Sequence, residues 1–199
     1  MFEVAEYIGI IAFSMSGFFV GVKNNLDLLG ILIATFLTAL GGGIMRDVTV
    51  SKIPFTFSHN YPALIVISVL LLLILFKFHH RNSLENKALF ILSDSIGLVS
   101  FSISGSLIAI ENHLNLTGIV AMSFLTAVGG GIARDVIINE VPFVLKTGFY
   151  GTVSIFIAII LYLLHTLHVT TYTSLAILFF TALGLRLVAY YAKWSIPLK

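Results

Sequence analysis

The sequence predicts an all-α membrane protein with seven transmembrane helices, arranged as an inverted 3+3 repeat followed by a seventh helix. Three observations lead to this fold class. The chain of 199 residues is 58% hydrophobic and only 10% charged, whereas soluble domains contain about 25% charged residues. Long apolar segments follow one another with short polar linkers between them. Finally, one motif occurs twice, as "LTALGGGIMRDV" from Leu37 and as "LTAVGGGIARDV" from Leu125.

Seven apolar segments have the length of membrane-spanning helices, because a helix that crosses a bilayer needs about 20 mostly apolar residues. They lack the period-2 alternation that is typical of strands. In chain order they are Val4–Val22, Leu28–Met45, Tyr61–Phe76, Ala88–Ile110, Leu114–Ala133, Thr147–Leu164 and Val169–Ala189. We expect residues 1–199 to form a single transmembrane domain.

The two halves of the chain are copies of each other. At an offset of 88 residues, Phe13–Val48 aligns with Phe101–Val136 without a gap, and 20 of the 36 positions are identical. We place the first repeat at about 4–78, the second at about 88–166 and the extra helix at about 169–191. Each repeat has an odd number of spans, so the halves are inverted. Such repeats are typical of transporters and channels, although duplication could also have built a plain helix bundle.

Basic residues predict the orientation, because cytoplasmic loops of membrane proteins are enriched in lysine and arginine. Seven spans place the two termini on opposite sides. Arg46 and Lys52 fall on the N-terminal side. The C-terminal side receives Lys23, Lys77, Arg81, Lys87, Arg134, Lys146, Lys193 and Lys199. We therefore expect a multi-pass protein of the cell membrane (plasma or inner membrane) with its N-terminus outside and its C-terminus in the cytoplasm.

The glycine triplets lie late in the second and fifth spans. Each glycine costs roughly 1 kcal/mol relative to alanine inside a helix, so three in a row predict a kink or an unwound turn. Freed backbone groups are tolerated at membrane depth only inside protein or beside a watery cavity. The candidate kink residues are Gly41, Gly42, Gly43, Gly129, Gly130 and Gly131. One interpretation is that their carbonyls face an ion path; the alternative is close helix packing, which small residues also permit.

Hydroxyl side chains accompany the triplets. Thr38 lies one helical turn before Gly42 and Thr126 occupies the equivalent place in the second half, while Ser16 and Ser104 add polar atoms to the first and fourth spans. These groups could coordinate an ion, or they could bond to their own backbone four residues earlier.

An arginine–aspartate pair follows each triplet. Arg46 with Asp47, and Arg134 with Asp135, are charged at membrane depth, where charges are costly and usually functional. We expect each arginine to be paired with an acid and the pairs to line the mouths of a path; plain anchoring at the interface is the alternative. Two further acids, Glu6 and Asp94, are weaker candidates of the same kind.

Several classes of protein are disfavoured. The chain has no cysteine, which excludes disulfides and thiolate metal sites. Its net charge of +2, without a long basic run, gives no reason to expect nucleic acid as a partner. The glycine motif lacks the GK[ST] ending of a phosphate-binding loop, and the histidines lack HExxH spacing. We expect no cofactor, no fixed metal and no enzyme activity.

The doubled GGGxxRD motif, in an inverted three-plus-three repeat followed by a seventh helix, resembles prokaryotic members of the trimeric intracellular cation (TRIC) channel family. The resemblance covers nearly the whole chain, and some relatives are labelled glycine transporters. It implies a homotrimer in the lipid bilayer with one pore in each protomer, carrying potassium and also sodium. It also places the six glycines at the pore bends and the four charged residues at the motif positions. From the residues alone, two alternatives stay open: a transporter of a small zwitterion such as glycine, and a structural protein.

Overall fold

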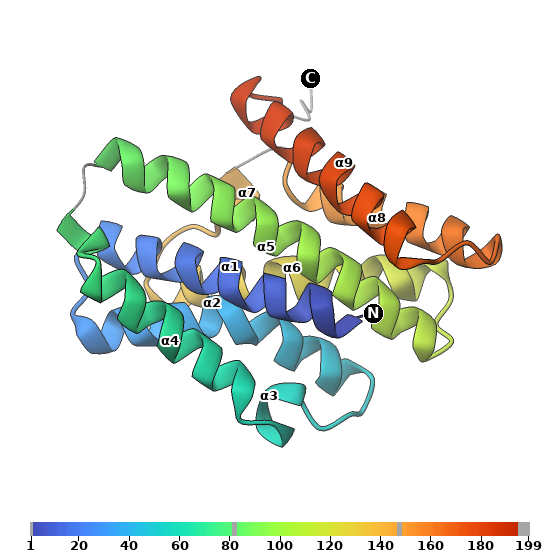
Figure 1. Ribbon diagram of the computed structural model, residues 1–199, viewed down its shortest axis with the longest axis horizontal. Coiled ribbons are helices and arrows are strands. Elements are labelled where there is room, and N and C mark those ends of the chain that lie inside the picture. Colours follow the sequence, from blue (N-terminus) through green and yellow to red (C-terminus); the bar gives the residue numbers. More distant parts are fainter. Residues whose placement is uncertain (1, 81–82, 147–148, 195–199) are drawn as a thin grey trace.

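The computed structural model describes residues 2–80, 83–146 and 149–194, in which all regular secondary structure is helical (Figure 1). The long helices are α1 Phe2–Lys23, α2 Leu28–Thr49, α4 Tyr61–Leu75, α5 Ser83–Glu111, α6 Leu116–Ile137, α8 Gly151–Thr166 and α9 Tyr172–Tyr191. Three short helices lie between them: α3 Phe55–Ser58, η1 Phe78–His80 and α7 Phe143–Lys146.

Five helices of the described chain are long and apolar enough to cross a membrane: α1, α2, α5, α6 and α9. This supports a multi-pass membrane protein. The helices α4 and α8 are equally apolar but contain only 15 and 16 residues, slightly fewer than the usual minimum of about 17. The total of seven spans therefore stays a prediction. Thr147, where the sixth span was expected to begin, and Arg81 and Lys199, which entered the orientation, lie outside the described residues.

The turns before α2 and α6 are built in the same way. The Asp27 side chain accepts a hydrogen bond from the backbone N–H of Gly30 at 2.7 Å, and the Asn115 side chain accepts one from Gly118 at 2.9 Å. Such N-caps satisfy backbone donors that have no partner inside the helix. The two repeats therefore share the hydrogen bonds of their N-caps as well as their amino-acid sequence.

Removing either cap is expected to destabilise the protein modestly. Asp27→Ala and Asn115→Ala should each cost about 1 kcal/mol, measurable as a lower midpoint of thermal unfolding in detergent. Asp27→Asn is the matched control, since asparagine caps a helix as well as aspartate. An equal loss in Asp27→Asn would show that the charge of Asp27, and not its hydrogen bond, stabilises this turn.

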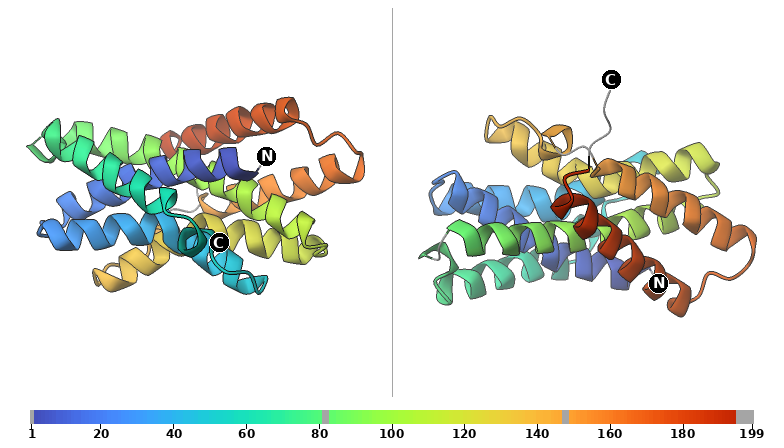
Figure 2. Two further views of the ribbon diagram at one scale, coloured as in Figure 1. Left: turned by 60° about the horizontal axis from the view of Figure 1, so that its bottom comes forward. Right: turned by 90° about the horizontal axis from the view of Figure 1, so that it is seen from above.

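The helices α1 and α5 run side by side in opposite directions through the middle of the molecule (Figures 1 and 2). Phe13 of α1 packs edge-to-face on Phe101 of α5, with ring centroids 5.2 Å apart. The Phe101 ring occupies the space beside Gly9, and the Phe13 ring occupies the space beside Gly97. Each contact is the repeat equivalent of the other, so the two halves interlock through the same aromatic–glycine pair used twice.

The helix α9, which has no counterpart in the repeats, packs against α5 and α8 at one side of the bundle (Figure 2). Large apolar side chains such as Leu71 of α4 and Phe180 of α9 are exposed. An apolar exterior of this kind suits contact with lipid tails, which are as apolar as leucine.

Candidate functional site at the glycine triplets and the charged clusters

The helices α2 and α6 touch backbone to backbone at the glycine triplets. A Cβ atom on Gly41 would lie 3.1 Å from the Cα of Gly130, and one on Gly130 would lie 2.6 Å from the carbonyl oxygen of Thr38. A Cβ on Gly42 would overlap the carbonyl oxygen of Thr126. Only glycine fits this crossing, which favours close packing as one role of the triplets.

The sequence predicted a kink or an unwound turn at each triplet, and the structure shows no unwound turn. Both α2 and α6 continue as unbroken α-helix through Gly41–Gly43 and Gly129–Gly131. The cost of glycine in a helix is offset here, because a missing side chain lets two helices approach closely inside a membrane. A bend of the helices without unwinding stays a prediction.

The hydroxyl groups beside the triplets bond mainly to their own helices. Thr38 Oγ1 donates to the carbonyl oxygen of Ala34 at 2.6 Å, and Thr126 Oγ1 donates to that of Met122 at 2.6 Å. Both are the bonds to the residue four positions earlier that Thr side chains form in helices. Ser16 and Ser104 behave differently and donate to carboxylates on the other repeat.

Glu6, Arg46, Asp47 and Ser104 form the first charged cluster, which we call the N-side cluster. Arg46 is only 1% exposed and forms ion pairs with Glu6 of α1 and with its neighbour Asp47. Ser104 Oγ donates to Glu6 at 2.6 Å and accepts from Arg46 Nη1 at 2.7 Å. The second oxygen of Asp47 accepts from the backbone N–H of Phe55 at 2.8 Å. Every acid and base of this cluster has a direct partner.

Ser16, Asp94, Arg134 and Asp135 form the repeat-equivalent set, the C-side cluster. Arg134 Nε donates to Asp135 at 2.8 Å, and Asp135 accepts from the backbone N–H of Phe143 at 2.7 Å. These two bonds reproduce those of the N-side cluster. Each motif arginine is thus paired with an acid, as expected from the sequence.

Asp94 breaks the correspondence between the two clusters. Among the ion pairs of the described residues, none joins Arg134 to Asp94. Arg134 Nη1 instead donates to Thr38 Oγ1 at 3.3 Å, and Asp94 accepts from Ser16 at 3.2 Å. The other oxygen of Asp94, Oδ2, is buried and has no hydrogen bond of ordinary geometry, although the Tyr150 side chain lies close enough to interact with the carboxylate. Aspartate is one methylene shorter than the Glu6 at the equivalent position, which reduces its reach.

The structure adds Arg186 of α9 and Tyr150 to the surroundings of Asp94. In the sequence, Arg186 is a basic residue inside the last expected span, Val169–Ala189. The signal that could have found its role is its position, because an arginine in an apolar helix requires buried partners. Arg186 is 1% exposed, and its guanidinium carbon lies 4.7 Å from the centre of the Tyr150 ring.

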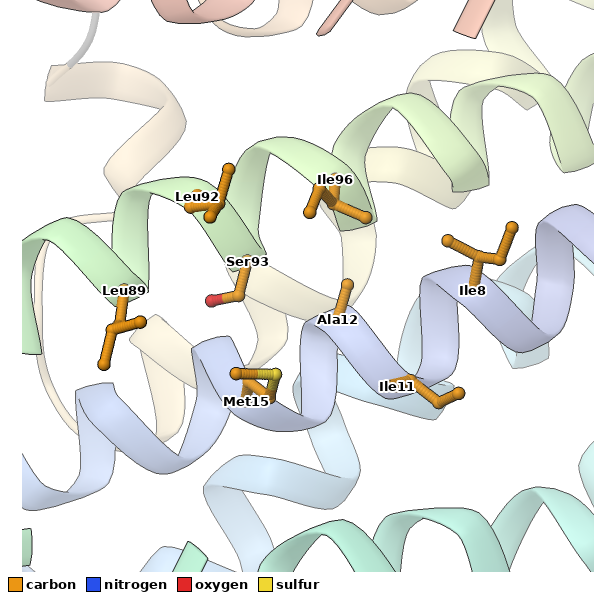
Figure 3. A pocket seen from close by; sticks show the side chains of 8 residues that line it. All are labelled: Ile8, Ile11, Ala12, Met15, Leu89, Leu92, Ser93 and Ile96. Atoms are coloured by element: carbon orange, nitrogen blue, oxygen red, sulfur yellow. The ribbon is translucent and has the colours of Figure 1, made fainter. Parts of the chain in front are cut away.

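The structure also contains an apolar groove outside the two clusters. It measures about 220 Å³, opens between α1 and α5, and is lined by Ile8, Ile11, Ala12, Met15, Leu89, Leu92, Ser93 and Ile96 (Figure 3). Ser93 is its one polar lining residue, so the groove suits an apolar group and not an ion. Within the residues that the structure describes, no cluster of three or more His, Asp or Glu side chains could hold a metal ion.

Comparison with known proteins identifies the family. The model of a family described as glycine transporter matches residues 3–80 and 91–166. The UPF0126 membrane protein YvgT of Bacillus subtilis (strain 168) is 32% identical, over 98% of this chain and 95% of its own length. A UPF0126 membrane protein of Deinococcus radiodurans is 41% identical over a shorter match, which covers 69% of this chain and 63% of that protein.

Two solved structures share the whole fold. One comes from a study of conductance through TRIC cation channels; it is 34% identical, has a TM-score of 0.84, and the match covers 100% of this chain and 97% of that one. The other is a prokaryotic TRIC channel in 0.5 M KCl. It is 26% identical and has a TM-score of 0.87, and the match covers 97% of this chain and 98% of that one. By sequence and by fold, the chain belongs to the TRIC cation channel family, to which the glycine-transporter family model and the UPF0126 membrane proteins also correspond.

Proposed function

We propose that the protein is a passive channel for monovalent cations, potassium and less selectively sodium, with a path inside each protomer beside the two glycine triplets. The main support is the likeness to a TRIC cation channel at 34% identity over the whole chain. The charged clusters fit this function, because buried arginines would repel cations unless acids neutralised them. Arg46 has two carboxylate partners and Arg134 has one.

The physical requirement for conduction is partial replacement of the water around an ion. Carboxylate oxygens at each cluster and hydroxyl oxygens at Thr38 and Thr126 are the groups suited to this, since alkali cations prefer oxygen ligands. The backbone contact between Gly42 and Thr126 leaves no room for an ion between α2 and α6 at that level. We therefore propose that the two helices shift relative to each other at the triplets when the path opens.

The membrane arrangement belongs to the same proposal. The helices α1, α2, α4, α5, α6, α8 and α9 would be the seven spans, in the orientation that the basic residues predict. The protein would assemble as a homotrimer, with one path in each subunit. Exposed apolar side chains and the groove of Figure 3 would then face lipid tails or neighbouring subunits.

One observation favours a second function. The matching family model is described as glycine transporter, and the clusters hold both charges that a zwitterion needs. An arginine could bind the carboxylate and an aspartate the amine, at sites related by an inverted repeat as in many transporters.

Recording from the purified protein in planar bilayers under a KCl gradient distinguishes the two functions. We expect discrete openings whose reversal potential moves toward the potassium equilibrium potential. Asp47→Asn and Asp135→Asn should lower the unitary current, because each leaves its arginine less neutralised. Protein that is folded but electrically silent, and that takes up radiolabelled glycine saturably, would overturn the channel in favour of the transporter.

A further inference from the structure

The two charged clusters lie toward opposite ends of the helix bundle. Glu6 lies near the start of α1 and Arg46 near the end of α2, while Arg134 lies near the end of α6. Since α1 and α5 run in opposite directions (Figure 1), the end of α2 and the end of α6 are at opposite ends of the bundle. Any difference in charge between the clusters is therefore a difference between the two ends of the proposed path.

Arg186 of α9 creates such a difference. The N-side cluster contains two carboxylates, of Glu6 and Asp47, and one guanidinium, so its formal charge is −1. The C-side cluster would have the same charge through Asp94, Asp135 and Arg134. Arg186 lies over the Tyr150 ring, which packs on Phe143, the residue whose N–H binds Asp135, and its charge raises the formal total to zero. The first repeat has no equivalent of Arg186, because α9 lies outside the repeat.

The positive charge of Arg186 is held by neutral partners. Its guanidinium carbon lies 4.7 Å from the centre of the Tyr150 ring and 5.6 Å from that of Tyr190, and its Nη1 donates to the carbonyl oxygen of Phe149 at 3.4 Å. Its Nε and Nη2 are buried without a hydrogen-bond partner. Cation–π contacts fix a cation in place without cancelling its charge. No ion pair thus absorbs this charge within the described part of the chain.

We propose that Arg186 makes the channel electrically asymmetric, so that cations enter faster from the N-side, where the cluster is negative, than from the C-side. This inference rests on the proposed channel function. Fixed charge at a mouth raises or lowers the local concentration of permeant ions. The field of such a charge extends about 30 Å at 0.01 M salt but only about 3 Å at 1 M. The expected signature is a current that is larger for cations moving from the N-side to the C-side, in low salt only.

The test measures two currents at equal voltages of opposite sign, in symmetric KCl at about 0.01 M and about 1 M. The measured ratio is the current carried by cations moving from the N-side to the C-side, divided by the current in the opposite direction. Sidedness is fixed by making every protein in a Lys52→Cys background, because the natural chain has no cysteine and Lys52 is exposed on the N-side. A cationic, membrane-impermeant thiol reagent then lowers the current only from the chamber that faces the N-side.

Arg186→Gln should lower this ratio roughly twofold in low salt, which is the effect of one unit charge about 10 Å away in water. Asp94→Asn should raise the ratio by a similar factor. Arg186→Lys should keep the ratio, and so should Asp94→Asn combined with Arg186→Gln, because both leave the cluster charge unchanged. Lys193→Gln, which removes an exposed charge on the same side, is the matched control and should change the ratio less.

The outcomes separate charge from structure. If Arg186 acts only through packing, the double variant will differ from the parent protein as much as Arg186→Gln does, and the proposal fails. It also fails if Arg186→Gln conducts with an unchanged ratio, or shifts it no more than Lys193→Gln. If Arg186→Gln does not fold, Asp94→Asn decides, and an unchanged ratio there overturns the inference. Absence of any current from the folded parent protein would reject the channel function itself.

Discussion

Gly42→Ala is expected to destabilise the protein by on the order of 1–3 kcal/mol or to prevent its folding, which is the usual cost of overpacking a core. The added Cβ would overlap the carbonyl oxygen of Thr126. That atom is backbone in the middle of α6, so the clash cannot be relieved by a side-chain rotation, and the two helices must move apart. The folded fraction that remains after stepwise heating in detergent, measured by size-exclusion chromatography, gives the size of the effect.

Gly184→Ala is the matched control. Gly184 also lies inside an apolar helix, α9, but a Cβ there would meet no atom within 4 Å. Alanine should be neutral there, or stabilise the helix by up to about 1 kcal/mol. Similar losses in Gly42→Ala and Gly184→Ala would mean that glycine matters for flexibility and not for the helix crossing.

The repeat supplies a second check on the crossing. A Cβ on Gly130 would lie 2.6 Å from the carbonyl oxygen of Thr38 and 2.7 Å from that of Leu37. Gly130→Ala should therefore resemble Gly42→Ala. The double variant should lose less than the total of the two losses, because mutations at one contact are not additive.

The sequence predicted most of the helices, because the length and hydrophobicity of a segment indicate a membrane-spanning helix without any knowledge of its tertiary contacts. The segments expected at Val4–Val22 and Leu28–Met45 lie within α1 and α2. It did not predict the short helices α3 and α7, of four residues each. Their starting N–H groups are held by Asp47 and Asp135, which is a tertiary contact and leaves no periodic pattern.

The charged site was predictable in its members but not in its connections. The motif identified the arginine–aspartate pairs, and the repeat identified Glu6 and Asp94. Which base reaches which acid depends on how the helices cross and on a single methylene group, since Glu6 reaches Arg46 while Asp94 does not form the matching ion pair with Arg134. Arg186 could not be assigned from the repeat, because it comes from the helix that the repeat lacks.

Arg46→Met is expected to destabilise the protein by about 3–5 kcal/mol, the usual cost of removing one partner from a buried ion pair. Glu6 and Asp47 are both nearly fully buried and would lose their shared counter-charge. The double variant Arg46→Met with Glu6→Leu should recover part of this loss, because one of the two unpaired carboxylates is removed as well. Thermal unfolding of the single and double variants measures the coupling between Arg46 and Glu6.

Lys146→Met tests whether burial is the cause. The Lys146–Glu140 pair spans 3.2 Å, but its side chains are 50% and 46% exposed, and exposed pairs contribute at most about 1 kcal/mol. Arg134→Met should destabilise the protein by an amount between those of Arg46→Met and Lys146→Met. Asp135 loses its only ion-pair partner among the described residues, whereas Asp94 still has Arg186 in its surroundings. The expected order of destabilisation is thus Arg46, then Arg134, then Lys146. If Arg134→Met were as damaging as Arg46→Met, Arg186 would not be supporting Asp94, and the two clusters would be energetically equivalent despite their different contacts.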